Sequence, residues 1–354
     1  MKKYIMAVLI SLSALQVVAL VTLKKDPVYR DARRNGAQTK IELHIQDDDG
    51  TPVPDAKIKA YLGMNFRPLG TWINGTTDTN GVFVLEGKTC GDEIEVFVAK
   101  DGYYGSHVIY RYAKMGEERD VKDGKWQPYG AAEKLILRRI VNPVLTSVGG
   151  QFVHTQRLNE WIGYDLEKRD FVSPFGAGIV ADFEVFFDWD GKWLPDYTGM
   201  GKKIRFADKY SGYYQCAVNA VSEFKGPYTA FPDATYQQDA DFYERVIIDP
   251  NAYGRRYERK VFDKNKCWVV RSRCKVDAEG NLVSAHYSVI NNIAFGCDKG
   301  GIACICVTGA FNPSPNDTNL EDAEIAKQSR HFIRNCEPPG KGNLKTWGQA
   351  PSNP

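Results

Sequence analysis

Four carboxylates and two tryptophans crowd one short stretch of the chain, D-F-E-V-F-F-D-W-D-G-K-W at residues 182–193. Glycosidases cleave their substrates with two carboxylates about 5–10 Å apart. Alternate residues of a strand lie about 6–7 Å apart on one face, so Asp182 and Glu184 meet this requirement. Most polar strand faces meet it as well. The interpretation that we favour therefore assigns no catalytic residue.

The same stretch has the composition of a carbohydrate-binding site. An exposed tryptophan can stack on a sugar ring while neighbouring carboxylates accept hydrogen bonds from its hydroxyls. We therefore predict Asp188, Trp189, Asp190 and Trp193 as candidate ligand-binding residues. The alternative is that these rings fill a hydrophobic core, as most aromatic side chains do.

Other catalytic and metal-binding patterns are missing from the sequence. The five histidines are scattered, and there is no H-E-x-x-H pair, G-x-S-x-G elbow, P-loop or G-x-G-x-x-G. No C-x-x-C pair offers the short spacing of a zinc site. Asp47, Asp48, Asp49 and Asp55 lack the spacing of an EF-hand, which favours a turn over a calcium site. We expect no metal and no cofactor, and we favour a non-enzymatic protein.

Net charge and chain length indicate which kinds of partner and how many domains to expect. The chain has 354 residues, and 46 Lys and Arg against 44 Asp and Glu leave a net charge of +2. Its densest basic cluster, residues 255–260, is interrupted by Glu258, so we expect no nucleic-acid partner. The length predicts about two domains.

The N-terminus has the pattern of an export signal. Lys2 and Lys3 precede twenty uncharged residues, 4–23, and two further lysines follow. Twenty apolar residues are also about enough to span a bilayer. Residues 1–25 are therefore either a cleaved signal peptide or a retained anchor that contacts the membrane through residues 4–23. Both alternatives predict an exported protein: periplasmic, cell-surface or secreted.

Period-two patterns predict strands after the N-terminal segment. K-I-E-L-H-I at 40–45 and E-I-E-V-F-V at 93–98 alternate apolar with polar residues. Asp47–Gly50 and Asp78–Gly81 are turn sequences, and Asn80-Gly81 is a strong hairpin signal. Short strands at this spacing are typical of a β-sandwich.

Three motifs in this region carry a family resemblance. D-G-T-P-V-P-D-A-K-I-K-A-Y (49–61), T-T-D-T-N-G-V-F-V-L (76–85) and G-D-E-I-E-V-F-V-A-K-D-G-Y-Y-G (91–105) together resemble the carboxypeptidase regulatory-like, or transthyretin-like, β-sandwich module, over about residues 38–141. The resemblance implies a small non-catalytic domain of the kind attached to exported enzymes, transporters and surface proteins. It implies no active site.

We predict that residues 142–336 form a second, larger β-rich domain with a sandwich or jelly-roll-like fold. Strand patterns recur at 182–189, 267–276, 282–290 and 301–311, and Thr318 and Glu321 predict a capping box for a helix over 319–334. Residues 337–354 form a Pro/Gly-rich tail. The segments 135–144, 163–176, 267–287 and 309–321 are similar to those of a group of uncharacterised exported bacterial proteins, which implies an architecture and a location but no activity.

Eight cysteines leave the disulfide pattern open. One, Cys90, falls in the first predicted domain and seven in the rest of the chain. Four bridges can be arranged in 105 ways. Cys304 and Cys306, two residues apart in an apolar strand, are predicted to be small buried hydrophobes.

The sequence thus predicts a mostly β, exported, non-enzymatic protein of the cell envelope or surface, with a binding or structural role and with glycans or envelope components as partners. The alternative is a secreted carbohydrate-binding or carbohydrate-active protein that uses the second domain.

Overall fold

The computed structural model describes residues 27–63, 70–112, 121–189, 193–194, 197–198, 201–219, 222–248, 255–297 and 302–335. The predicted signal peptide or anchor and the predicted tail lie outside these ranges. Within the ranges, no helix is both long and apolar enough to cross a membrane.

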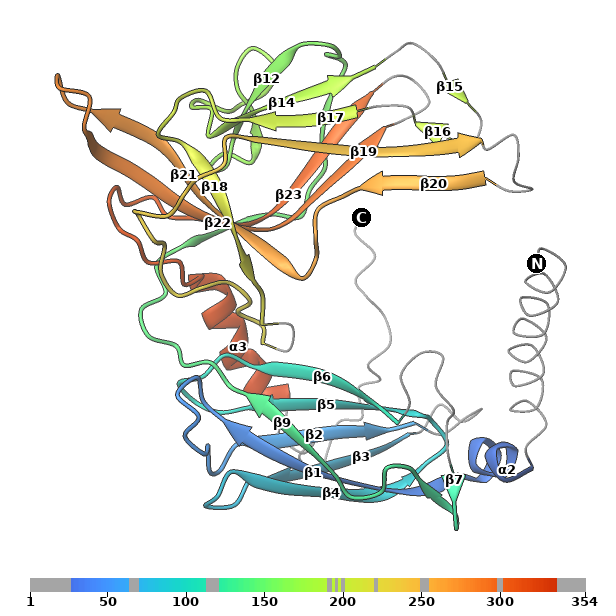
Figure 1. Cartoon of the computed structure of the whole chain (residues 1–354). Coiled ribbons are helices and arrows are strands. Elements are labelled where there is room, and N and C mark those ends of the chain that lie inside the picture. Colours follow the sequence, from blue (N-terminus) through green and yellow to red (C-terminus); the bar gives the residue numbers. More distant parts are fainter. Residues whose placement is uncertain are drawn as a thin grey trace, which may run out of the picture. The chain divides into compact units, whose positions relative to one another are not determined.

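The chain is mostly β and divides into two compact units (Figure 1). Unit 1 takes Met1–Arg139, Val221–Glu223 and Ser329–Pro354. Unit 2 takes Ile140–Ala220 and Phe224–Gln328. The predicted fold class, a β-sandwich followed by a larger β-rich domain, is confirmed.

Unit 1 is built from two sheets. The first has the order β4-β1-β8-β7, and β9 pairs in parallel with β1. Its strands are β1 (Ala37–Gln46), β4 (Val82–Thr89), β7 (Val121–Lys122), β8 (Lys125–Trp126) and β9 (Ala131–Ile136). The second has the order β3-β2-β5-β6, with β2 (Lys57–Leu62), β3 (Thr71–Thr76), β5 (Glu93–Ala99) and β6 (Ser106–Arg111). A helix that the sequence patterns did not predict, α2 (Pro27–Asn35), precedes β1.

The predicted alternation places the core of unit 1 between these sheets. Ile41, Leu43 and Ile45 of β1 are buried, and so are the alternate apolar residues of β2 and β5. The facing set is Ile58, Ala60, Leu62, Ile94, Val96 and Val98. Side chains on a strand point alternately to opposite faces, so the intervening residues of β2 and β5 point away from this core.

The two acidic turns carry the chain from one sheet to the other. Gly81 adopts φ +73°, and Asp78 accepts hydrogen bonds from the Asn80 and Val82 amides at 2.9 and 2.8 Å. However, β3 pairs with β2 whereas β4 pairs with β1, so this turn does not join two paired strands. The hairpin that Asn80-Gly81 predicts is therefore wrong. The residue pattern specifies the turn but not the sheet that the next strand joins.

Asp47, in the first acidic turn, is bound by protein groups. Its carboxylate is buried, accepts the Asp49 and Thr51 amides at 3.0 and 2.9 Å, and forms an ion pair with Arg139 at 2.5 Å. Burial opposes ionisation, but Arg139 and the amide donors hold the pKa of Asp47 below its usual value. These donors use the oxygens that a cation would need.

Unit 2 also contains two large sheets. One has the order β10-β23-β22-β21-β18, and β11 also pairs with β23; its strands are β10 (Thr146–Gly149), β11 (Val153–Thr155), β18 (Gly212–Ala217), β21 (Lys266–Val276), β22 (Leu282–Cys297) and β23 (Ala303–Phe311). The other has the order β13-β12-β14-β17-β19-β20, with β12 (Trp161–Asp165), β13 (Asp170–Phe171), β14 (Phe183–Asp188), β17 (Gly201–Arg205), β19 (Asp239–Ile248) and β20 (Arg255–Lys260). A short pair, β15 (Trp193–Leu194) and β16 (Tyr197–Thr198), is separate from both.

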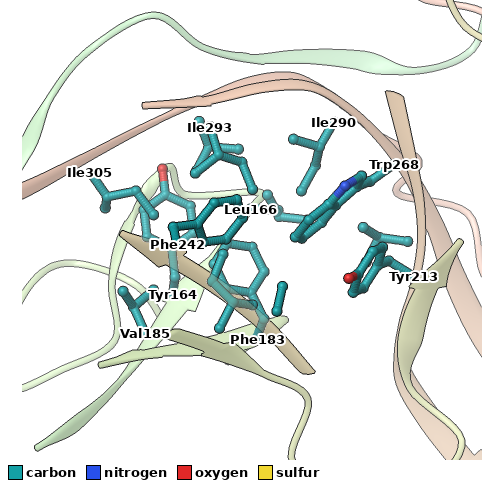
Figure 2. Close-up of a cluster of buried hydrophobic side chains, with 14 of the residues drawn as sticks. Tyr164, Leu166, Phe183, Val185, Tyr213, Phe242, Trp268, Ile290, Ile293 and Ile305 are labelled. Atoms are coloured by element: carbon teal, nitrogen blue, oxygen red, sulfur yellow. The ribbon is translucent and has the colours of Figure 1, made fainter. Parts of the chain in front are cut away.

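A core rich in aromatic side chains joins the two large sheets of unit 2 (Figure 2). Phe183, Val185 and Phe187 contribute from β14, and Trp268 contributes from β21. The Trp268 ring stacks on Tyr213 with the ring centroids 3.7 Å apart. The opposite side of β21, β22 and β23 is buried by a second apolar cluster, which explains why β23 is apolar almost throughout.

The predicted hairpin at Asp277–Asn281 is confirmed, and the predicted helix exists with a different start. Strands β21 and β22 pair across the turn, where Gly280 has φ +86°. The helix α3 spans Ala323–Asn335, and its N-cap is Asp322, which accepts the Glu324 and Ile325 amides at 2.8 and 3.1 Å. The predicted capping box is wrong, because Glu321 accepts the Val141 and Asn142 amides instead.

A glycine on β23 permits a close approach of two backbones. The pairing of β22 with β23 shifts register between Ile290 and Asn292, opposite Gly309. A Cβ atom on Gly309 would lie 2.0 Å from the Val289 carbonyl oxygen and 2.9 Å from Ile290 Cα. Backbone atoms cannot move aside as a side chain can, so this position requires glycine.

We expect Gly309→Ala to lower the free energy of unfolding of unit 2 by about 1–3 kcal/mol, as overpacking does. Thr308→Ala is the matched control, because Thr308 is the exposed neighbour on the same strand and its loss should cost less than about 1 kcal/mol. Urea denaturation monitored by tryptophan fluorescence measures both. Equal stabilities of the two variants would contradict the close approach.

Candidate ligand-binding faces

The predicted binding residues lie at and just beyond the end of β14. Asp188 is exposed and forms an ion pair with Lys203 at 3.3 Å. Trp189 packs partly buried against the aromatic core, and its backbone amide and carbonyl bond the Asn159 side chain. The two side chains therefore lie on opposite faces of the sheet.

The other two predicted residues are described only in part or not at all. Asp190 lies outside the described residues. Trp193 is placed by its backbone in β15, opposite Thr198, and nothing is described of its side chain. Asp188 and Trp189 thus do not share a face, and the position of Asp190 and of the Trp193 side chain beside either of them remains a prediction.

Asp188 shares its outward face with aromatic neighbours that the sequence analysis did not select. Phe186 and Trp161 are cross-strand partners on β14 and β12, with ring centroids 5.2 Å apart. Lys203 lies over Phe186 at 5.5 Å, and Arg205 lies over Trp161 at 4.1 Å. We call Trp161, Phe186 and Asp188 the unit 2 face.

The two carboxylates with spacing suited to glycoside hydrolysis, Asp182 and Glu184, each form an ion pair with a different arginine. Glu184 bonds Arg205 at 2.5 Å on the outer face of the sheet. Asp182 precedes β14 and is buried, where Arg273 and Ser272 bond it at 3.0 and 2.6 Å. The strand pattern predicts a polar outward position for Asp182. The structure buries it because Arg273 supplies a compensating charge.

Arg273 is the centre of a buried ionic cluster. Its guanidinium bonds Asp182 at 3.0 and 3.1 Å, Asp165 at 2.9 Å and Glu167 at 2.7 Å, and lies 4.4 Å from the centroid of the Phe311 ring. Arg273 has φ +53°, next to a register shift between β21 and β22. The bulge directs this side chain to the carboxylates.

Every partner in this cluster is already bonded to another protein group. Burial opposes ionisation of Asp165. The Ile179, Lys168 and Val180 amides and the charge of Arg273 nevertheless hold the pKa of Asp165 below its usual value. Burial raises the pKa of Asp182, against the donors Arg273, Ser272 and Leu166. A set of carboxylates with saturated oxygens acts as a clamp between loops. The oxygens of its two buried members, Asp165 and Asp182, are all bonded to protein groups.

A more open arrangement covers the outer face of the β3-β2-β5-β6 sheet in unit 1. The registers place Tyr61 opposite Trp72 and Phe97 opposite His107. All four side chains occupy outward positions, because the alternate residues of the same strands face the core. We call Trp72, Tyr61, Phe97 and His107 the aromatic face.

The rings of the aromatic face form a continuous row across the four strands. Ring centroids are 5.0 Å apart for Tyr61 and Trp72, 6.2 Å for Trp72 and Phe97, and 4.4 Å for Phe97 and His107, whose planes differ by 7°. Trp72 is 44% exposed, and Ile109 beside the row is 39% exposed. Large exposed rings are costly in water unless something covers them.

Polar groups of both signs border this row. Lys59 lies over the Trp72 ring at 4.8 Å, and Glu95 bonds His107 at 3.0 Å. Arg111 and Glu93 form an ion pair at 2.8 Å at one end. The aromatic face thus combines aromatic rings with hydrogen-bond donors and acceptors, and has little net charge.

The sequence analysis missed the aromatic face, although its signal was present. In E-I-E-V-F-V the pattern fixes Ile94, Val96 and Val98 as inward, which makes Phe97 an outward aromatic residue. An outward ring on a solvated sheet is the anomaly that marks a binding surface. Its coincidence with Trp72 requires the strand order, which the sequence does not contain.

The described residues contain no group of three or more His, Cys, Asp or Glu side chains arranged to hold a metal ion.

Comparisons with known proteins identify no family. No family model and no curated protein sequence matches the chain. Solved structures similar to part of it include 3-chlorocatechol 1,2-dioxygenase from Rhodococcus opacus 1CP, at 12% identity and TM-score 0.23 over 30% of this chain and 61% of that one. Another is catechol 1,2-dioxygenase from Acinetobacter sp. ADP1, at 16% identity and TM-score 0.23 over 30% and 54%. The chain spans less than two thirds of their lengths, and function is argued below from its own residues.

We expect Arg273→Met to lower the free energy of unfolding by about 3–5 kcal/mol, because it leaves buried carboxylates without a counter-charge. Arg205→Met is the matched control: its ion pair with Glu184 is partly exposed, and its loss should cost about 1 kcal/mol. Urea denaturation at pH 7 compares the two. If both variants lose the same free energy, the Arg273 cluster is not the clamp described above.

Proposed function

We propose that this chain is an exported, non-enzymatic protein of the cell envelope or surface that binds a neutral glycan through the aromatic face of unit 1. The observation that carries the proposal is the row of four rings, Trp72, Tyr61, Phe97 and His107, on the solvent side of a sheet whose other side forms the core. Rings in such positions contribute nothing to that core.

A carbohydrate suits this surface on chemical grounds. The C–H faces of a sugar ring are apolar and flat, so they stack on aromatic rings, while its hydroxyls need hydrogen-bonding groups at the margin. Glu95 and Asn74 supply such groups beside the row. A binding role also agrees with the resemblance of unit 1 to a non-catalytic accessory module.

The charge of the face favours a neutral glycan over a nucleic acid. Single-stranded nucleic acids also stack on aromatic platforms, but they require a positively charged groove along the backbone. Here Lys57, Lys59 and Arg111 are offset by Glu93 and Glu95 on the same side of the sheet. Aromatic stacking without a basic surface therefore favours sugars.

The unit 2 face supports a second candidate, a carbohydrate-binding or carbohydrate-active role of the second unit. Trp161 and Phe186 are adjacent there, and the exposed Asp188 is one of the predicted binding residues. This row has two rings, compared with four on the aromatic face.

Binding of the full chain to a panel of immobilised neutral polysaccharides distinguishes the two faces. We expect Trp72→Ala to weaken binding about tenfold, which corresponds to a loss of about 1.4 kcal/mol of stacking energy. Trp161→Ala is the matched control and should leave affinity unchanged. The reverse result would assign the ligand to the unit 2 face. Failure of the wild-type chain to bind any polysaccharide would contradict a glycan ligand.

Export has its own test. Because a charged residue at the centre of an apolar segment costs about 2.5–3.5 kcal/mol on insertion, Leu15→Arg should keep the chain in the cytoplasm of a bacterial host while the wild type leaves it. Cell fractionation measures this, and mass spectrometry of the exported N-terminus separates a cleaved signal from a retained anchor. A wild-type chain found intact in the cytoplasm would contradict export.

A further inference from the structure

Two thiols of unit 2 lie directly opposite each other on paired strands. Cys216 is on β18 and Cys267 is on β21, and the antiparallel register pairs the two residues. The thiol of Cys267 hydrogen-bonds that of Cys216, so both point to the same side of the sheet. Neither residue forms a disulfide in this structure.

This position has the backbone geometry of a disulfide. Directly opposed residues of an antiparallel pair have Cα atoms about 4.5–5.5 Å apart. Disulfides join residues whose Cα atoms are about 4.4–6.8 Å apart. The two cysteines therefore already meet the requirement on the backbone.

The two sulfurs differ in their access to solvent. Strand β18 is at the edge of its sheet, and Cys216 on it is half-buried. Cys267 lies on the inner neighbour β21 and is fully buried. A reagent in solution can therefore reach Cys216 first, and Cys267 lies opposite it on the neighbouring strand.

None of the other described thiols has a cysteine opposite it. Cys304 pairs with Gly296 and Cys306 with Ala294, and both thiols are buried, as predicted from their spacing. Cys274 accepts a hydrogen bond from Ser211 at 3.4 Å. Cys90 lies in unit 1, where its thiol contacts the Arg34 carbonyl at 3.8 Å.

We propose that Cys216 and Cys267 are the two halves of a cross-strand disulfide, formed by exchange with a small-molecule disulfide such as oxidised glutathione. The Cys216 thiolate attacks one glutathione sulfur, the glutathione S–S bond breaks, and one glutathione thiolate leaves. The sulfur of Cys267 then attacks the Cys216 sulfur of the mixed disulfide, the bond to glutathione breaks, and the proton of Cys267 passes to the second glutathione, which leaves as a thiol. Two protein thiols are oxidised, and one glutathione disulfide is reduced to two thiols.

The disulfide would link the edge strand β18 to its neighbour β21 and would close a long loop of the chain. The chain between the two cysteines includes β19 and β20, which belong to the other large sheet of unit 2. Closing a loop of about 50 residues restricts the unfolded chain strongly. Oxidation should therefore stabilise unit 2 and resist fraying of β18.

Peptide mapping of the full chain tests the proposal. The protein is incubated with oxidised glutathione, its remaining thiols are alkylated, and it is digested without reduction. Mass spectrometry should find a Cys216–Cys267 linked peptide that disappears after dithiothreitol, and the melting temperature should rise by about 4–16 °C on oxidation. Cys216→Ser should abolish both effects, whereas Cys274→Ser should retain them.

The peptide map of the oxidised wild-type chain shows whether the disulfide forms, even if a variant fails to fold. Glutathione that stays attached to Cys216 without closure onto Cys267 would overturn the proposal. A linkage of either cysteine to a different partner would overturn it as well. This test is independent of glycan binding and of export.

Discussion

Both units are held together by sheets that pack against each other through alternate side chains. At about 25 cal/mol for each Å² of apolar surface buried, such faces provide most of the favourable free energy of folding. In unit 1 the contributing residues are aliphatic, as in β1, β2 and β5. In unit 2 aromatic and aliphatic residues contribute about equally, and the Tyr213–Trp268 stack lies between the sheets. Because alternate residues of a strand point to opposite faces, this packing also determines which side chains lie on the outer faces.

The buried charges lie where loops meet the sheets: one at a turn that crosses between layers, the others where β21 of one sheet contacts loops of the other sheet. The Asp47 turn between β1 and β2 is neutralised by Arg139, and the loops around β12 and β14 are tied by Arg273. A buried carboxylate without its arginine would be strongly destabilising. These acids are therefore part of the framework, although their composition resembles that of catalytic or calcium-binding groups.

The sequence predicts the strands of this protein better than it predicts their neighbours. Alternation identifies the inward residues of β1, β5 and β14, because each depends only on local spacing. It does not show that β3 and β4 join different sheets, since the Asn80-Gly81 turn is compatible with either outcome. Local spacing also fails to predict the burial of Asp182. The residue occupies a polar position in the strand pattern, but its burial depends on Arg273, ninety-one residues away.

The aromatic face follows from the same reasoning applied to outward positions. An inward ring is explained by the core, whereas Phe97 and Trp72 lie on the side that a solvated sheet normally gives to polar residues. One such ring is unremarkable, because single apolar residues are common on protein surfaces. Four adjacent rings contributed by four strands require the fold to bring them together, and they leave a partly exposed aromatic row on the outer side of the sheet. The same strand order that builds the core of unit 1 therefore also builds its candidate binding surface.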